Sequence, residues 1–165
     1  MFQTIETAEL ESLLKEKFGE KILLIEKLYD VSVVTISHDI IKNMMKHLQQ
    51  SGFSFLTSCH GMHFPDVEQK FGMVYHLHDL QRNLRIRIKA FTHHDPPHFP
   101  SLIDIYPAAN WMERETYDFF GFRFDGHPNL KRILNEDSLE GWPLRKEFPL
   151  EDQARFDKDD KMFGR

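Results

Sequence analysis

The chain has 165 residues, of which 41% are hydrophobic and 28% charged, and its formal net charge is −5. This length suits one domain that is stable without disulfides or structural metals, and the acidic balance argues against binding nucleic acid through phosphate contacts. Cys59 is the only cysteine, which excludes an internal disulfide and any cysteine-based iron–sulfur or zinc site on this chain alone.

Apolar runs in the sequence are all shorter than the roughly 20 residues that span a bilayer. Residues 1–6 carry an early acid and no basic segment, so we do not expect a signal peptide. Any association with a membrane is therefore expected to pass through a partner. The single cysteine fits a reducing cytoplasmic compartment.

Periodicity over the first 106 residues predicts two helices and five strands. Apolar residues recur at helical spacing over 7–19 and 37–52. The strands are predicted at 21–25, 31–36, 53–62, 71–80 and 84–91. The three residues 81–83 are short enough to close a hairpin. We expect residues 1–106 to form an α+β domain with helices packed on one face of a mainly antiparallel mixed sheet.

The second half of the chain has less regular hydrophobic periodicity and more frequent glycines and prolines. Residues 93–100 contain three prolines and no periodicity, and we expect a loop there. A helix is predicted from Pro107 to Gly121, followed by glycines and prolines too frequent for another long helix. We therefore expect residues 107–150 to form a helix and a long irregular docking segment. Residues 151–165 are expected to be a charged, mobile tail.

The ten histidines raise the possibility of a metal site. His76 and His78 share one face of a predicted strand, and such a pair can ligate zinc or iron. Further ligands would have to come from His60, His63, Asp66 or His98. The simpler interpretation, which we favour, is that these histidines occupy the wetter face of an amphipathic strand. A stand-alone histidine-ligated metalloenzyme stays the alternative.

Catalytic candidates are few. Glu113, Glu115 and Asp118 could supply general acid–base chemistry, but no cleft-forming pattern accompanies them. Cys59 lies in an apolar predicted strand, where a structural thiol is commoner than a reactive one. The eight glycines form neither a Walker A loop nor a dinucleotide fingerprint. We expect no catalytic, cofactor-binding or metal-binding residues on this chain.

The predicted helix from Pro107 to Gly121 interleaves aromatic residues with charges. One interpretation is a solvated helix with surface ion pairs, each contributing about 0–1 kcal/mol. Against it, the aromatics leave the helix without a clean polar face, so it must be covered on several sides. The irregular stretch that follows is rich in Trp, Phe and Arg, which is typical of protein–protein interfaces.

Motifs in this half of the chain resemble the 30 kDa subunit family of respiratory complex I, known in bacteria as the C subunit of NADH-quinone oxidoreductase. The similarity is dense over about forty residues and weaker upstream, where the basic strand Arg85–Lys89 and the stretch Pro107–Trp111 also resemble the family. The matching positions are Glu113-Arg114-Glu115, Tyr117-Asp118, Gly121, Phe124, His127-Pro128, Leu130, Arg132-Ile133-Leu134, Gly141, Pro143-Leu144-Arg145-Lys146 and Pro149.

The resemblance implies a non-catalytic peripheral-arm subunit of a proton-translocating NADH:quinone oxidoreductase. FMN, iron–sulfur clusters and quinone would belong to partner subunits. The chain would dock on the 49 kDa-type subunit and its neighbours near the quinone module, on the cytoplasmic side of the cell membrane, as part of a hetero-oligomer. The docking residues would be Trp111, Glu113, Arg114, Glu115, Asp118, His127, Pro128, Arg132, Trp142, Arg145 and Lys146.

Two features qualify this expectation. Residues 135–139 differ from the Met-Pro-aromatic pattern that the family often has there, so local docking can differ. The chain also stops soon after the motif, and we expect a separate subunit rather than a fusion with the 49 kDa-type subunit. Relatives in membrane-bound hydrogenases and other NDH-type complexes carry similar motifs, which leaves the electron donor open.

Overall fold

The computed structural model describes residues 7–149, with side chains described from residue 11 onward. Two short 3-10 turns, Gly19–Lys21 and His38–Ile40, precede β1 and α2. The helices are α1 (Thr7–Phe18), α2 (Ile41–Gln50) and α3 (Ala109–Phe120). The strands are β1 (Ile22–Leu28), β2 (Val31–Ile36), β3 (Phe55–His63), β4 (Phe71–Asp79), β5 (Leu84–Thr92), β6 (His98–Pro100) and β7 (Arg123–Asp125).

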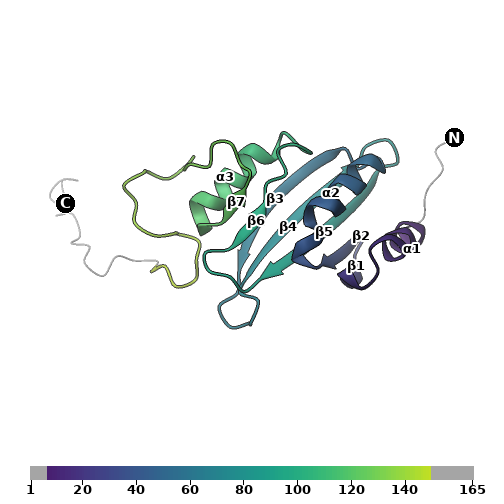
Figure 1. Ribbon diagram of the computed structural model, residues 1–165, viewed down its shortest axis with the longest axis horizontal. Coiled ribbons are helices and arrows are strands. Elements are labelled where there is room, and N and C mark those ends of the chain that lie inside the picture. Colours follow the sequence, from purple (N-terminus) through teal and green to yellow (C-terminus); the bar gives the residue numbers. More distant parts are fainter. Residues whose placement is uncertain (1–6, 150–165) are drawn as a thin grey trace, which may run out of the picture.

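A five-stranded sheet in the order β1-β2-β5-β4-β3 forms the centre of the fold (Figure 1). Neighbouring strands are antiparallel except for β2 and β5, which run parallel. The predicted α+β class with a mainly antiparallel mixed sheet is therefore confirmed. The alternation read from the sequence sets the register, because Tyr75 lies opposite both Ile88 and Cys59 and all three face the core.

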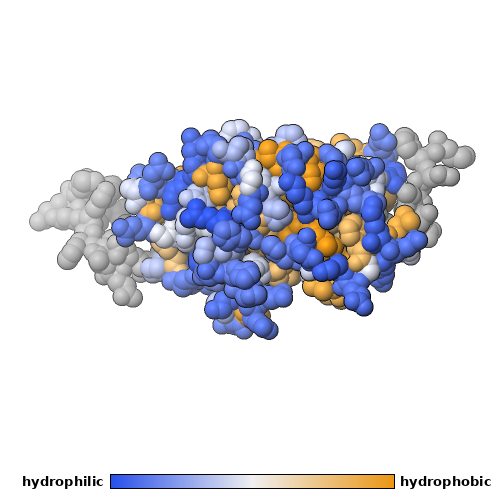
Figure 2. Space-filling model, viewed as in Figure 1, coloured by the Kyte–Doolittle hydropathy of each residue, from blue (hydrophilic) through white to orange (hydrophobic). Residues whose placement is uncertain are grey.

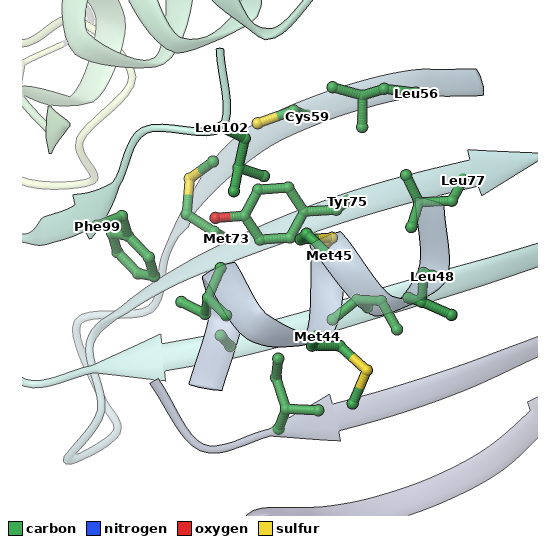
Figure 3. Close-up of a cluster of buried hydrophobic side chains, with 14 of the residues drawn as sticks. Met44, Met45, Leu48, Leu56, Cys59, Met73, Tyr75, Leu77, Phe99 and Leu102 are labelled. Carbon is green, nitrogen blue, oxygen red and sulfur yellow. The ribbon is translucent and has the colours of Figure 1, made fainter. Parts of the chain in front are cut away.

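The core lies between the sheet and the helices. The apolar face of α2, which includes Met44, Met45 and Leu48, is fully buried against β4 and β5. In Figure 3 the ring of Tyr75 lies among Met45 of α2, Cys59 of β3 and Leu102. Burying such side chains contributes about 1.5–3 kcal/mol each, so this layer is the main source of stability.

Three predictions about element boundaries need correction. The segment 93–100 is not all loop, because β6 pairs in parallel with β7 and places Phe99 opposite Phe124. A three-residue strand among prolines has no periodicity from which to predict it. The strand expected at 21–25 extends to Leu28, where it pairs with Val31. The helix expected from Pro107 begins at Ala109 and ends, as predicted, at Gly121, whose φ is +76°.

One hydrophobic cluster runs through the sheet and on into the second half of the chain. Phe99, Leu102, Ala109, Phe122 and Phe124 belong to the same cluster as the α2 side chains. Packing therefore continues without a break across residues 106 and 107. The predicted tail, 151–165, lies outside the described residues. Among residues 7–149, no helix is both long and apolar enough to cross a membrane.

Candidate docking site

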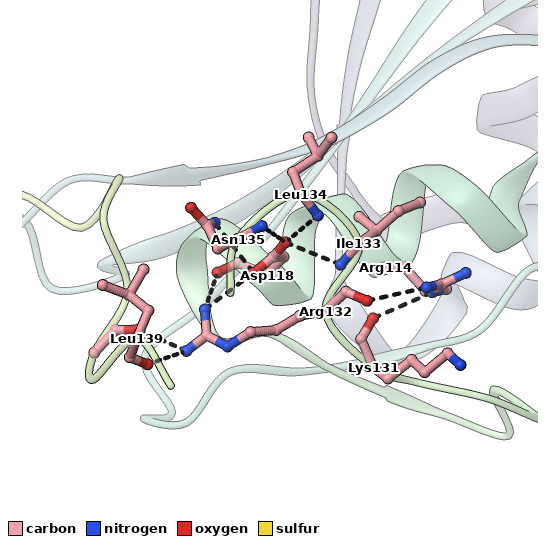
Figure 4. A network of polar contacts seen from close by, with 9 residues as sticks. Arg114, Asp118, Lys131, Arg132, Ile133, Leu134, Asn135 and Leu139 are labelled. Atoms are coloured by element: carbon pink, nitrogen blue, oxygen red, sulfur yellow. Dashed lines mark hydrogen bonds and ion pairs between the residues drawn. The ribbon is translucent and has the colours of Figure 1, made fainter. Parts of the chain in front are cut away.

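Asp118, on the last turns of α3, organises the segment that follows the helix. Its Oδ2 accepts hydrogen bonds from the backbone N–H groups of Ile133, Leu134 and Asn135 at 3.0, 2.7 and 2.9 Å (Figure 4). Its Oδ1 accepts from Nη1 of Arg132 at 3.0 Å. Burial acts to raise the pKa of Asp118, but these backbone donors outweigh it and hold the pKa well below its usual range. The carboxylate is therefore charged and fixes residues 132–135 to α3.

Arg132 extends this network toward the C-terminal side. Its Nη2 donates to the carbonyl oxygens of Leu139 and Gly141 at 2.9 and 3.0 Å. Its guanidinium also lies over the ring of Trp142, 4.8 Å from the centroid. One side chain therefore closes the loop of residues 133–141, which contains no regular secondary structure.

Two further arginines hold the ends of the segment. Arg114 donates to the carbonyl oxygens of Lys131 and Arg132 at 3.1 and 3.0 Å. Arg145 donates to the carbonyl oxygen of Phe120 at 2.7 Å and pairs with Asp95 at 3.1 Å. Arginine suits this work because its planar group binds several acceptors at once.

The end of α3 and the segment meet closely at Gly121. A Cβ at this position would approach the Trp142 ring to 2.5 Å, and the positive φ is one that side chains rarely adopt. The backbone N–H of Leu144 donates to the carbonyl oxygen of Phe119 at 3.1 Å. The backbone N–H of Lys146 donates to Nδ1 of His63 at 3.1 Å, which connects the segment to the sheet.

Glu113 is a residue of α3, and its side chain is fully buried. Its carboxylate accepts from Ser101 Oγ and from the backbone N–H of Leu102, both at 2.7 Å. Burial raises its pKa to about 7, although these two hydrogen bonds act in the opposite direction. Glu113 therefore anchors the 101–102 turn rather than facing solvent.

The structure separates the predicted docking residues into two groups. One group forms contacts within the chain: Glu113, Arg114, Asp118, Arg132 and Arg145. The other group, which is exposed, comprises Trp111, Glu115, Pro128 and Lys146. Trp142 is half-buried under Arg132, and His127 is half-buried beside the carbonyl oxygen of Asn110. Whether members of either group contact a partner stays a prediction.

Sequence reasoning named Trp111 as a docking residue but missed three other apolar side chains that are exposed beside this network, Ile133, Leu134 and Leu144. Leu134 is 66% exposed and Leu144 is 50% exposed, with Ile133 and Trp111 also at the surface. Hydrophobic groups stand out among hydrophilic ones over α3 and the following segment in Figure 2. We call Trp111, Ile133, Leu134 and Leu144 the apolar patch. An irregular segment has no period that would reveal which side chains face outward.

The histidines considered as metal ligands do not converge. His63 stacks on Phe71 on the core face, whereas His60 stacks on His76 on the opposite face. His98 pairs with Asp125 beside β7. Within residues 7–149, no three His, Cys, Asp or Glu side chains are placed to share a metal ion.

The sequence-predicted catalytic candidates Cys59, Glu113 and Asp118 are buried, and the two carboxylates form hydrogen bonds within the chain. Burial, followed by the charges of Glu113 and Glu115, raises the pKa of the Cys59 thiol well above its usual value. The thiol is therefore protonated and unreactive. Glu113 and Asp118 have their acceptor oxygens engaged within the chain, whereas Glu115 is exposed on α3. Of these groups, Asp118 alone binds residues of the apolar patch, through the backbone N–H groups of Ile133 and Leu134.

Comparison with known proteins gives consistent matches. Residues 34–154 match the family described as respiratory-chain NADH dehydrogenase, 30 kDa subunit. The NADH-quinone oxidoreductase C subunit of Methylobacterium sp. (strain 4-46) is 40% identical over 157 residues, covering 92% of this chain and 72% of the relative. Its counterpart from Sinorhizobium medicae is 38% identical over 159 residues, covering 93% and 78%. The counterpart from Methylobacterium radiotolerans is 49% identical over 108 residues, covering 64% of this chain and about half (49%) of the relative.

Solved structures show the same fold. A trypsin-resistant fragment of Nqo5 superposes with a TM-score of 0.65 at 30% identity, covering 73% of this chain and 98% of the fragment. A chain of the membrane-bound sulfane sulfur reductase, an archaeal respiratory membrane complex, superposes with a TM-score of 0.71 at 26% identity. That match covers 92% of this chain and 96% of the other.

Proposed function

The chain belongs to the family of 30 kDa subunits of respiratory-chain NADH dehydrogenase, and we propose that it serves there as a non-catalytic docking subunit. The surface that docks is the segment from Trp111 to Pro149, centred on the apolar patch. Its partner is the 49 kDa-type subunit, near the quinone module and on the cytoplasmic side of the membrane. FMN, iron–sulfur clusters and quinone belong to partner subunits.

The main support for this proposal is that the side chains of the apolar patch are exposed although hydrogen bonds hold the backbone of their segment in place. Asp118 and Arg132 hold the segment in one conformation, and the leucines beside them point into solvent. A preformed segment loses little conformational entropy on binding, which favours tight association. Exposed Trp and Leu side chains beside fixed arginines are typical of interface centres.

The non-catalytic part of the proposal has separate support. The carboxylate oxygens of Glu113 and Asp118 accept hydrogen bonds from other residues of this chain. The Cys59 thiol is buried and protonated. Of the groups that first suggest an active site, Asp118 therefore binds the docking segment, Glu113 anchors the 101–102 turn and Cys59 packs in the core. Electron transfer and ion translocation are assigned to the partner chains.

Truncating the patch tests the docking role. We expect Leu134→Ala combined with Leu144→Ala to reduce recovery of the partner subunits with the tagged chain from membranes by about a hundredfold. The reason is that burying one leucine at an interface contributes about 1.5–3 kcal/mol. The measurement is quantitative mass spectrometry of the co-purified subunits, together with NADH:quinone oxidoreductase activity of the membranes.

A matched control exists on the edge strand β1. Leu23 and Leu24 are 59% and 52% exposed, so Leu23→Ala with Leu24→Ala removes a similar apolar area far from α3. This control should co-purify the partners at the wild-type level. Equal recovery for both double variants, with both proteins folded, would contradict docking through the apolar patch.

A related complex is the second candidate. The likeness to a chain of the archaeal sulfane sulfur reductase, at 26% identity, favours an equivalent position in a complex with a different electron donor. The same purification distinguishes the two. Recovery of flavin-bearing, NADH-oxidising subunits supports the respiratory dehydrogenase, whereas hydrogenase-type or sulfur-reducing subunits support the alternative.

A further inference from the structure

The sheet face opposite the helices carries a second surface, apart from the docking segment. Within residues 7–149 the helices α1, α2 and α3 contribute side chains to the core on the other face. Near the β4–β5 turn the uncovered face has a hollow of about 460 Å³, lined by residues of β2, β3, β4 and β5. We propose that this outer-face hollow binds an acidic segment of a partner protein, with its carboxylates on Arg85 and Arg87 and a neighbouring apolar side chain on Phe55.

Arg87 is held in position without a carboxylate. Its Nε donates to Nε2 of His76 at 2.6 Å. Since Nε2 accepts this bond, the ring proton of neutral His76 lies on Nδ1, which is 2.8 Å from Ser58 Oγ. Burial, with the Arg87 charge as the second cause, lowers the pKa of His76 to about 4. The imidazole therefore orients Arg87 and leaves its positive charge uncompensated.

Arg85 adds a second uncompensated charge. Its side chain is exposed, and it makes no ion pair or hydrogen bond with any described residue. The carboxylate of Asp30 lies with Arg85 around a neighbouring hollow of about 180 Å³, but the two do not pair. Two guanidinium groups with free N–H donors on one wall are complementary to carboxylates, which bind arginine in a bidentate manner.

The apolar floor of the hollow is left open, unlike the rest of this face. Further along the sheet Val33 and Val74 are buried although they point outward, because they lie opposite Arg87 and Lys89, whose stems cover them. Phe55, at the start of β3, is 48% exposed in the hollow. An exposed aromatic side chain beside arginines is typical of a binding anchor.

The hollow is distinct from the docking segment. α3 packs on β3 near Gly61, where a Cβ would meet Thr116 at 2.8 Å. Phe55 lies six residues earlier on the same strand, about 20 Å away. In Figure 1 the β4–β5 turn lies at the end of the sheet remote from the segment that follows α3. A partner on the hollow therefore binds beside, and not through, the apolar patch.

Photo-crosslinking in the assembled complex tests this inference. The photoreactive amino acid p-benzoylphenylalanine replaces Phe55 in the full chain, the complex is irradiated, and the attached peptide is identified by mass spectrometry. We expect one partner subunit to be crosslinked through a peptide with at least two Asp or Glu within a few residues of the attachment point. We also expect Arg85→Glu to lower the yield about tenfold, because it places like charges together. Lys46→Glu, an exposed change on α2, should leave the yield unchanged.

The remaining outcomes overturn the inference. These are the absence of a crosslink at Phe55, attachment to a peptide without acids, and a yield insensitive to Arg85→Glu. Binding of the purified chain to phosphatidylglycerol vesicles that is lost in Arg85→Glu would assign the hollow to a lipid headgroup instead. The same photoreactive residue at Leu134 reports on the docking segment, so failure at Phe55 with success at Leu134 rejects the hollow alone.

Discussion

Replacing Asp118 by asparagine should release the docking segment from α3. The change keeps the shape of the side chain but removes the charge that binds Arg132, and in either orientation its amide N–H₂ faces donors, the backbone N–H groups or the Arg132 guanidinium, where only an acceptor fits. Removing one partner of a buried ion pair typically destabilises by about 3–5 kcal/mol. We expect the equilibrium for local opening of residues 131–142 to rise by about two to three orders of magnitude.

Amide hydrogen exchange measures this opening directly. Exchange should speed up at Ile133, Leu134 and Asn135, whose N–H groups bind the carboxylate, while the β4 and β5 amides keep their protection. Asp137→Asn is the matched control, since Asp137 is exposed in the same segment. If Asp118→Asn exchanged like the control, the network around Asp118 would not be what orders the segment.

The same substitution links the network to docking. As the open form gains population, a smaller fraction of the chain presents the apolar patch in its bound form, and the apparent affinity falls with that fraction. Partner recovery should therefore fall for Asp118→Asn although no residue of the apolar patch has changed. Leu134→Ala with Leu144→Ala, in contrast, should weaken docking without changing exchange at these amides.

The sequence predicted the parts of the fold that have a period or a stop signal. The alternation along 84–91, the helical spacing over 37–52 and the glycine after α3 all appear in the structure as expected. β6 was not predictable, because it exists through pairing with β7, which lies some 25 residues later in the chain. Short strands of this kind depend on tertiary contacts and not on local preference.

The candidate site was predictable in its location and less so in its inner arrangement. The many charged and aromatic residues between Trp111 and Pro149 indicate where the segment lies. They do not indicate which of the charged residues form contacts within the segment. Asp118 contacts Arg132, 14 residues later and beyond both the end of α3 and β7, and Arg145 contacts Phe120, 25 residues earlier. Such contacts follow no helical or strand spacing and cannot be predicted from the sequence. Only the folded chain shows that Asp118 and Arg132 bind the backbone of the segment while the side chain of Leu134 faces solvent.

Glu113 gives the fold a pH dependence opposite in sign to that of Asp118. Burial raises the pKa of Glu113 from its ordinary 4.5 to about 7, so the folded state binds a proton more tightly than the unfolded chain. Its stabilisation is complete below about pH 4.5 and is lost as the pH rises to about 7. The low pKa of Asp118 acts in the other direction, because its stabilisation is lost as the pH falls below the ordinary value of 3.8.

Glu113→Gln should therefore be more stable at pH 8, relative to pH 5, than wild type is, because it removes this contribution. Histidines whose pKa is lowered by burial, such as His76, change stability in the opposite direction below their ordinary pKa of 6.5, but they do so in both proteins and cancel in the difference. The shift to about 7 corresponds to about 3 kcal/mol, as an order of magnitude, at 1.36 kcal/mol per pH unit. The amide oxygen of glutamine can still accept from the backbone N–H of Leu102, so the 101–102 turn stays in place. Urea unfolding at both pH values measures the difference for wild type and variant.

Glu115→Gln provides the control, since Glu115 is exposed on the same helix and lies two residues away. That variant removes a carboxylate from the exposed side of the same helix and leaves the buried Glu113 in place, so its stability difference between the two pH values should match that of wild type. If Glu113→Gln showed the same stability difference between pH 5 and pH 8 as wild type, the titrating group would not be Glu113. A shifted pH dependence, with docking retained, would show that the proton on Glu113 affects the stability of the fold whereas the apolar patch sets association.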